Sequence, residues 1–368
     1  PASAMASAAV AKRPASAGAA TAHQALPRGG GATVCVTGAA GYLGSWLVKL
    51  CLERGHLVRA CVRNVDDDRK VGFLKETPEF KAGRLTLHAA DMTTAGAYDD
   101  VFKGAHTVFH PAEVFMSFTP GKDIEKAEKD LGAKNTEESK HRGAMSSSQY
   151  TADSIGRSGS MKQLIYTSSM MSMMMGSVEA YEAYPIIDET REPEPGHLMT
   201  GTNSYSVTKR NGELFFSEAA AKSGGAWRCL VGCPSDIIGP IVGAHQASDC
   251  WQGKLSGILK GVPTVQEAHD ARPWMTVDVR DVAEAHLRLA ESSIESGSRF
   301  LITSTDKIPP EHIGPRIVEL FPEYDCPVDV EKRLERSHPI WLRVQPRNDR
   351  VVQALGMKFR SWDDTLRD

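Results

Sequence analysis

From residue 32 onwards, short runs of apolar and β-branched residues alternate with longer amphipathic stretches. Each run has the length of a strand buried in a sheet, and the stretches between them have the character of helices. The strand-like runs cover residues 32–37, 57–63, 84–89, 106–110, 162–168 and 227–233. This alternation predicts an α/β fold with a doubly wound parallel sheet, whose ligands bind beyond the carboxyl ends of the strands.

A polar stretch over residues 119–160 interrupts the alternation. Residues 121–140 are heavily charged, as in a solvated helix, whereas residues 145–160 are rich in Ser and Gly, so we expect an irregular or extended segment there. After Pro234 the pattern loosens. We therefore expect a nucleotide-binding domain over 32–234 and a smaller substrate lobe mainly in 235–368, from which some segments return to the first domain.

Residues 1–31 differ in composition from the rest of the chain. They are rich in Ala, Ser and Gly, contain Lys12, Arg13 and Arg28, and have no acidic residue. This bias is typical of a transit peptide for a plastid or mitochondrion, and a disordered alanine-rich tail is the alternative. The arm therefore predicts a location in a plastid or mitochondrion. If the arm is not a transit peptide, we expect the protein in the cytoplasm. A larger organellar assembly that contacts the arm stays open as a partner.

The composition excludes several classes of partner. The net charge of −3 gives no reason to expect a nucleic-acid surface. No run approaches the ~18 apolar residues of a membrane span. The seven cysteines are scattered without CxxC pairs, which favours a reduced compartment over a disulfide framework, and we expect no metal site.

The first strand-like run leads into a glycine-rich turn and then into an amphipathic run. The turn reads Thr37-Gly38-Ala39-Ala40-Gly41-Tyr42-Leu43-Gly44. Gly38 permits a tight turn, Gly41 removes a Cβ where a pyrophosphate would lie, and Gly44 lets the helix pack close to the strand. The helix N-terminus offers free N–H groups to the phosphates, so the motif predicts a Rossmann-type dinucleotide site. A glycine-rich loop without a ligand is the alternative.

The next two strand ends suggest which dinucleotide binds. Arg63 stands where an NAD site usually has an acidic residue, and Lys70 follows seven residues later. A guanidinium there suits a 2′-phosphate, so we expect NADP(H) in preference to NAD(H), and we interpret the acidic run 66–68 as a solvated turn. Asp91 and Met92, after the third run, are candidates to flank the adenine, and Asp91 also suits a capping role.

A candidate catalytic set follows the fifth run. Tyr205 and Lys209, four residues apart, share one helix face. A lysine ammonium near a phenol lowers the pKa of the phenol and makes it a usable general acid. Ser169, at the end of the fifth run, supplies a hydroxyl for a substrate carbonyl oxygen, unless it only caps the next element.

Together these motifs resemble the extended short-chain dehydrogenase/reductase superfamily, from about Thr33 to the C-terminus. The more specific resemblance is to dihydroflavonol reductases, cinnamoyl-CoA reductases and related NADPH-dependent carbonyl reductases. The motifs that carry it are the glycine turn, Val62-Arg63, Ala90-Asp91-Met92, Tyr166-Thr167-Ser168-Ser169, Tyr205-Ser206-Val207-Thr208-Lys209, Pro234-Ser235-Asp236-Ile237-Ile238-Gly239-Pro240 and Val277-Asp278-Val279-Arg280-Asp281.

The resemblance assigns a role to each of these positions. It implies that Tyr205 donates a proton to the carbonyl oxygen, that Lys209 holds the nicotinamide ribose and that Ser169 is the catalytic serine. It also implies that the glycine turn binds the pyrophosphate, that Arg63 and Lys70 bind the 2′-phosphate, that Asp91 and Met92 flank the adenine, and that the segment from Pro234 to Ile237 binds the carboxamide of the nicotinamide. The implied cofactor-binding set is therefore Gly38, Gly41, Tyr42, Leu43, Gly44, Arg63, Lys70, Asp91, Met92, Pro234 and Ile237.

The chain departs from the group's pattern in three places. Where the group has Ser or Thr after His-Val-Ala, this chain has Glu113, preceded by His110-Pro111-Ala112. Met174 stands where dihydroflavonol reductases have an Asn for the flavonoid. The motif around Tyr205, Thr202-Asn203-Ser204-Tyr205-Ser206-Val207-Thr208-Lys209, differs from the motif of cinnamoyl-CoA reductases at this place. We therefore take Glu113, Ser172 and Met174 as candidate substrate contacts and disfavour both of those substrates.

The sequence thus predicts an NADPH-dependent reductase that transfers hydride to a small or medium apolar aldehyde or ketone. A structural or accessory subunit of an organellar complex, with the same fold and without turnover, is the alternative. A nucleotide-sugar epimerase or dehydratase, or a hydroxysteroid dehydrogenase, is a further one, because such enzymes share the Ser, Tyr and Lys.

Overall fold

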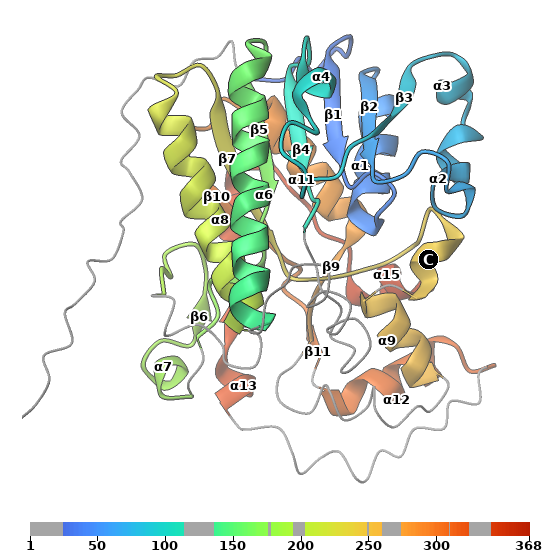
Figure 1. The fold of residues 1–368 in the computed structure, drawn as a ribbon. Helices are drawn as coiled ribbons and strands as arrows, with labels where there is room; N and C mark the ends of the chain where they lie inside the picture. Colours follow the sequence, from blue (N-terminus) through green and yellow to red (C-terminus); the bar gives the residue numbers. More distant parts are fainter. Residues whose placement is uncertain are drawn as a thin grey trace, which may run out of the picture.

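The computed structural model describes residues 25–113, 136–175, 178–193, 203–248, 250–259, 274–308, 310–323 and 340–368. Its centre is a seven-stranded parallel sheet in the order β10-β7-β5-β4-β1-β2-β3 (Figure 1). The strands are β1 (Thr33–Thr37), β2 (Leu57–Val62), β3 (Leu85–Ala89), β4 (Thr107–His110), β5 (Gln163–Thr167), β7 (Arg228–Pro234) and β10 (Arg299–Ile302). The predicted fold class is confirmed, and the sheet order reverses between β1 and β4.

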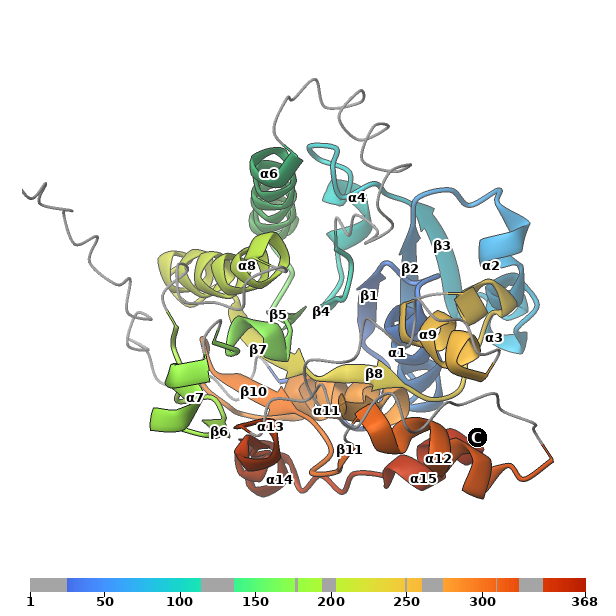
Figure 2. The same cartoon turned by 90° about the horizontal axis from the view of Figure 1, so that it is seen from below.

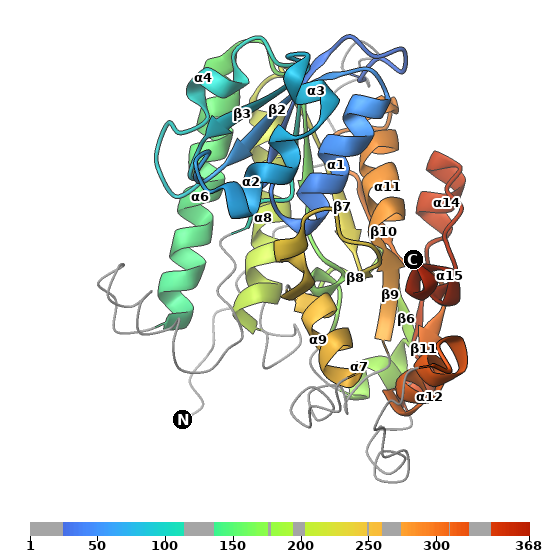
Figure 3. The same ribbon diagram turned by 90° about the vertical axis from the view of Figure 1, so that its right-hand side faces the viewer.

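Helices cover both faces of this sheet (Figure 3). Helices α1 (Tyr42–Glu53) and α11 (Val279–Glu291) pack together on one face, and α6 (Thr136–Ser158) and α8 (Asn203–Lys222) pack together on the other. Each face has its own hydrophobic core, which we call the first and the second core cluster, and Leu47 and Phe216 are fully buried members of the two. Shorter helices follow β2 and β3, namely α2 (Asp68–Lys75), α3 (Pro78–Lys81) and α4 (Asp99–Phe102).

Helix α6 corrects the expectation of an irregular segment over 145–160. Its hydroxyl side chains do not break the helix, because they donate to carbonyl oxygens four residues earlier, as Ser147 does to Gly143 and Thr151 to Ser147, each at 2.9 Å. Both hydroxyl residues are fully buried, and such small side chains allow α6 to lie close to α8. Residues 114–135, which include most of the charged stretch, lie outside the described residues.

The C-terminal part of the chain contributes to two places. A three-stranded sheet of β8 (Asp236–Ile238), β9 (Trp274–Asp278) and β11 (Lys307–Ile308) lies below the carboxyl ends of the main sheet, together with the helices α9 (Cys250–Leu259), α12 (Pro310–Leu320) and α15 (Trp362–Arg367) (Figures 1 and 2). Strand β10 and helix α11, by contrast, belong to the main sheet and its covering layer. The remaining described elements are β6 (Ile186–Ile187), which pairs with β12 (Gln345–Pro346), and the helices α7 (Val178–Ala183), α13 (Ile340–Arg343) and α14 (Asp349–Leu355).

The end of the N-terminal arm is part of the folded domain. Leu26 is 2% exposed and belongs to the first core cluster, and its backbone N–H donates to the carbonyl oxygen of Ala290 at 2.7 Å. A buried leucine thus ties this segment to the end of α11. Residues 1–24, on which the organellar prediction mainly rests, lie outside the described residues.

In the described part of the chain, no helix combines the length and the hydropathy needed to cross a membrane. The same residues contain no group of three His, Cys, Asp or Glu side chains arranged to hold a metal ion.

Candidate active site

The glycine turn between β1 and α1 has the conformation that the motif predicts. Gly38 has a φ of 59°, in the left-handed region that favours glycine. A Cβ on Gly44 would lie 2.2 Å from the carbonyl oxygen of Gly38, so α1 can pack this close only with glycine there. A Cβ on Gly41 would lie 3.1 Å from the same oxygen. The turn thus brings the start of α1 to the carboxyl end of β1.

The first turn of α1 provides a surface for an anion. Helix α1 begins at Tyr42, with Gly41 as its N-cap, and first-turn N–H groups such as those of Tyr42 and Leu43 have no intrahelical acceptor. Together with the helix dipole, they form the kind of site that binds phosphate groups. The Tyr42 side chain turns away to donate to the carbonyl oxygen of Gly239 at 2.6 Å. The geometry therefore suits a pyrophosphate, as predicted.

Two exposed cations follow β2. Arg63 and Lys70 are exposed, and neither side chain forms an ion pair with any other described residue. Two carboxylates of the acidic run beside them have partners of their own, because Asp67 contacts Arg69 at 3.3 Å and Asp68 contacts Lys75 at 2.6 Å. Arg63 and Lys70 therefore remain candidates for a 2′-phosphate.

After β3, Asp91 stabilises a turn. Its carboxylate accepts from the backbone N–H of Thr93 at 2.9 Å and from the Thr93 hydroxyl at 2.8 Å. Met92 is half-buried and packs against the second core cluster. Both residues lie just beyond the end of β3, and their contact with an adenine ring stays a prediction.

The predicted catalytic tyrosine and lysine lie in α8. The Lys209 ammonium lies 5.8 Å from the ring centre of Tyr205, and it donates to the carbonyl oxygen of Thr167, the last residue of β5, at 2.9 Å. Lys209 is 3% exposed. The sequence spacing of four residues therefore does place both groups on the face of α8 that meets the carboxyl end of the sheet.

Ser169 follows β5 at the same edge. Its side chain is 8% exposed, and its hydroxyl oxygen accepts from the backbone N–H of Met171 at 3.2 Å, which caps the 3-10 helix η2 (Met170–Ser172). The capping role considered from the sequence is thus present. It leaves the hydroxyl hydrogen available as a donor, which is the role that the resemblance assigns to it.

Lys209 has a partner that the group's pattern lacks. The Glu113 carboxylate lies 2.7 Å from the Lys209 ammonium, across the carboxyl ends of β4 and β5. Burial opposes the charge of Lys209, but Glu113, Tyr166 and Tyr205 together raise the pKa of Lys209 above its usual value. The lysine is therefore charged at neutral pH and already engaged by a carboxylate.

The comparison with family models identifies the chain. The model of the NAD-dependent epimerase/dehydratase family matches residues 34–303, which span the main sheet and the site described above. The chain belongs to this family. The resemblance to dihydroflavonol and cinnamoyl-CoA reductases is confirmed, and with it the assignment of the chain to the oxidoreductases.

Two relatives and one structural neighbour of the chain are reductases by name. Cinnamoyl-CoA reductase 2 of Medicago truncatula is 30% identical over 346 residues, which cover 92% of this chain and 90% of the relative. Dihydroflavonol 4-reductase of Callistephus chinensis is 29% identical over 300 residues, which cover 80% and 74%. Among solved structures, yeast methylglyoxal/isovaleraldehyde reductase Gre2 complexed with NADPH has a TM-score of 0.66 at 19% identity and covers 91% of this chain and 96% of its own. None of these supports an organellar assembly as a partner.

The end of β7 offers a polar group for the carboxamide that the family's cofactor carries. Pro234 ends the strand and is buried, and Ile237, in β8, packs against the first core cluster. Between them, the buried Ser235 hydroxyl has no hydrogen-bond partner among the described residues. An orphaned buried hydroxyl at this place fits a cofactor amide, and with the glycine turn it shows that the residues present suit a nicotinamide dinucleotide.

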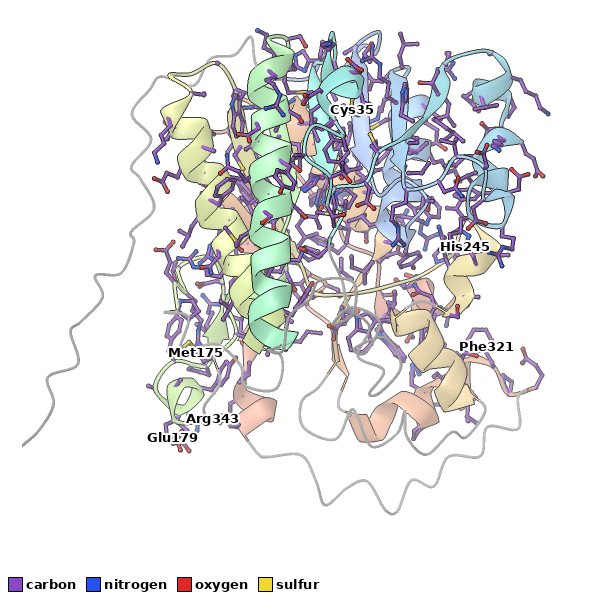
Figure 4. The ribbon with its side chains drawn as sticks, viewed as in Figure 1. Cys35, Met175, Glu179, His245, Phe321 and Arg343 are labelled. Carbon is purple, nitrogen blue, oxygen red and sulfur yellow. The ribbon has the colours of Figure 1, made fainter. Side chains whose placement is uncertain are left out.

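A segment that sequence reasoning missed lies against the glycine turn. We call residues 239–248 the strap, because they cross from β8 to α9 past the start of α1 (Figure 1). Gln246 is fully buried and donates to the carbonyl oxygens of Ala40 and Gly41 at 3.2 and 3.3 Å. His245, labelled in Figure 4, shares a 2.8 Å hydrogen bond with the Ala40 carbonyl oxygen. The strap thereby fixes the turn from outside, and no pattern in the sequence indicated it.

A second missed residue is Glu213, in α8. It is 0% exposed and accepts hydrogen bonds from Ser168 at 2.6 Å and Ser172 at 2.5 Å, and Arg299 lies 3.1 Å away. The single hydroxyl hydrogen of Ser172 is shared between Glu213 and the carbonyl oxygen of Ser169, which lies 2.8 Å from the Ser172 oxygen. The predicted substrate residue Ser172 therefore holds the backbone of Ser169 in place. A lone glutamate in a helical sequence gives no sign of such burial.

Met174, the other predicted substrate contact in this stretch, is also 0% exposed and belongs to the second core cluster. In this structure Met174 fills the core rather than facing an open site. Contact of Ser172 or Met174 with a substrate stays a prediction, and it requires this cluster to open.

Proposed function

We propose that the protein is an NADPH-dependent reductase that transfers hydride to the carbonyl carbon of a small or medium apolar aldehyde or ketone, with Tyr205 as the proton donor. The observation that supports it most is the position of Lys209, which is buried, charged and next to the ring of Tyr205 at the carboxyl end of the sheet. The family membership and the reductase relatives agree with it.

The residues of the chain have separate tasks in this proposal. NADPH, when bound, supplies the hydride. Ser169 donates its hydroxyl hydrogen to the substrate oxygen, and Tyr205 delivers the proton as negative charge develops there. Lys209 stabilises the phenolate that Tyr205 becomes, because a fixed ammonium beside a phenolate in a poorly hydrated site interacts strongly with it. Glu213 acts through Ser172 to hold Ser169 in place.

The proton-donor role predicts a separation of binding from turnover. Tyr205→Phe removes the hydroxyl and keeps the ring, so NADPH affinity should stay within about twofold of the wild-type value, while kcat falls by about a thousandfold. Titration calorimetry and NADPH oxidation with a panel of aldehydes and ketones measure the two quantities. Full turnover in the variant would disprove the proposed role of Tyr205.

For the cofactor, we propose that NADP(H) is preferred over NAD(H) because Arg63 and Lys70 bind the 2′-phosphate. The support is their exposure and the lack of ion pairs with other described residues. Arg63→Ala should weaken NADPH binding about tenfold and leave NADH binding unchanged. Arg69→Ala is the matched control, because Arg69 is 89% exposed at the start of α2 and pairs with Asp67. Equal affinity of the wild type for NADH and NADPH would contradict the preference.

A further inference from the structure

Glu113 lies where the order of the main sheet reverses. Strands β1 and β4 are neighbours there, and such a reversal is where ligands of open α/β sheets bind, beyond the carboxyl ends of the strands. The two loops are close, because a Cβ on Gly38 would lie 3.2 Å from the Cα of Ala112, the residue before Glu113. A dinucleotide with its pyrophosphate on the glycine turn therefore passes Glu113 on its way to Lys209.

Glu113 and Lys209 form a largely buried ion pair at this edge of the sheet. Their side chains are 15% and 4% exposed, and the ammonium and the carboxylate oxygen are 2.7 Å apart. The Lys209 ammonium also donates to the Thr167 carbonyl oxygen, which fixes its position relative to β5. The pair thus presents a fixed hydrogen-bond donor and a fixed acceptor side by side.

The chemistry of the pair selects the ligand group that fits it. An ammonium only donates hydrogen bonds and a carboxylate only accepts them, whereas a hydroxyl group does both. A phosphate group only accepts, and its charge would be repelled by the carboxylate. Two neighbouring hydroxyls satisfy the pair best, one accepting from Lys209 and one donating to Glu113. In NADPH only the nicotinamide ribose has both hydroxyls free, since the adenine ribose carries the 2′-phosphate.

We propose that Glu113 is a cofactor-binding residue whose carboxylate accepts a hydrogen bond from a hydroxyl of the nicotinamide ribose while Lys209 donates to that ribose. This inference rests on the proposed function, and it replaces the substrate role predicted for Glu113. The ion pair need not open for the ribose to bind. An ammonium has three N–H groups, of which Thr167 and Glu113 take two, and a carboxylate accepts several hydrogen bonds at once.

The test compares two ligands that differ in the nicotinamide half. The full chain is titrated by calorimetry with NADPH and with adenosine 2′,5′-bisphosphate, which contains the adenine ribose and its 2′-phosphate but no nicotinamide ribose. The variants are Glu113→Gln, which removes the charge, and Glu113→Asp, which keeps it on a shorter side chain. Glu218→Gln is the matched control in α8, because Glu218 is 58% exposed and pairs with Lys222.

We expect Glu113→Gln to weaken NADPH binding about tenfold and to leave bisphosphate binding within about twofold of the wild-type value. Glu113→Asp should weaken NADPH binding less, and Glu218→Gln should change neither affinity. Unchanged or tighter NADPH binding by Glu113→Gln would overturn the inference. Unchanged binding would mean that the Glu113 carboxylate does not contact the ribose, and tighter binding would mean that the carboxylate competes with the ribose for Lys209.

Two other outcomes separate this inference from the proposed function. An equal loss of affinity for both ligands in both Glu113 variants would mean that the residue supports the fold rather than the ribose, and would overturn the inference alone. A wild-type protein that binds neither ligand would overturn the inference and the proposed function together. If Glu113→Gln does not fold, the ratio of the two affinities in Glu113→Asp decides.

Discussion

Two buried histidines lie close to the carboxyl ends of β4 and β5. His286, in α11, shares hydrogen bonds with the Val282 carbonyl oxygen at 2.8 Å and the Thr167 hydroxyl at 2.9 Å. Because a carbonyl oxygen only accepts, Nδ1 carries the hydrogen and Nε2 accepts from Thr167. His110, at the end of β4, is 1% exposed and lies 2.8 Å from the Thr37 hydroxyl. Burial lowers the pKa of each imidazole to about 4.

These pKa values predict a loss of stability in mild acid. In the unfolded chain the histidines bind protons near pH 6.5, whereas in the folded protein they do so only near pH 4, so the free energy of unfolding falls as the pH drops through this window. Each histidine should remove about 2 kcal/mol between pH 7 and pH 5. His286→Gln should therefore lose about 2 kcal/mol less than the wild type over this range, measured by urea denaturation at both pH values. An identical loss in both proteins would contradict a neutral buried His286.

At the scale of elements, the strap and the first turn of α1 behave as one unit. Gln246 donates to Ala40, Gly41 and Ser45, and its side-chain oxygen accepts from the backbone N–H groups of Val242 and Gly243 at 3.0 and 3.2 Å. Trp46 adds a hydrogen bond to the Pro240 carbonyl oxygen at 2.9 Å. The shape of the glycine turn therefore depends on a segment about 200 residues away in the chain.

Gln246→Ala tests this dependence. It leaves buried carbonyl and N–H groups unpaired, so we expect a destabilisation of about 1–3 kcal/mol and faster hydrogen exchange in the strap and the start of α1. NADPH affinity should fall with it. Gln149→Ala is the control, because Gln149 is exposed on α6 and its side-chain amide donates to Asp153 on the same helix. Unchanged exchange in the strap would show that other contacts hold the turn.

At the scale of the whole molecule, the sequence predicts the strands of the sheet and the glycine turn better than it predicts the long-range side-chain contacts. Six strands and the glycine turn follow from local patterns, because buried strands and tight turns restrict residue types over a few positions. Strand β10 is not predicted, because one of its four residues is Arg299, and a charged residue does not indicate a buried strand. Arg299 is 1% exposed, and its charge is neutralised by Glu213. Helix α6 escapes prediction because its hydroxyls are satisfied within the helix.

The same limit applies to the site. Ser169, Tyr205 and Lys209 stand in recognisable strings, and the structure brings all three to the carboxyl edge of the sheet. Glu213 and Gln246 belong to no recognisable sequence motif, because their roles depend on partners that are far away in the chain. Glu113 is visible in the sequence only as a departure, and its ion pair with Lys209 depends on how β4 and α8 meet.

Hydride transfer to a carbonyl carbon is the central claim, and isotope transfer measures it most directly. The full chain is incubated with NADPH that carries deuterium at the nicotinamide C4 position, in its R and S forms, and with a panel of small and medium apolar aldehydes and ketones. We expect deuterium on the carbinol carbon of at least one alcohol product, from one of the two forms only, and none with Tyr205→Phe above about a thousandth of the wild-type rate. A protein that binds NADPH but transfers deuterium to no member of the panel would contradict the account.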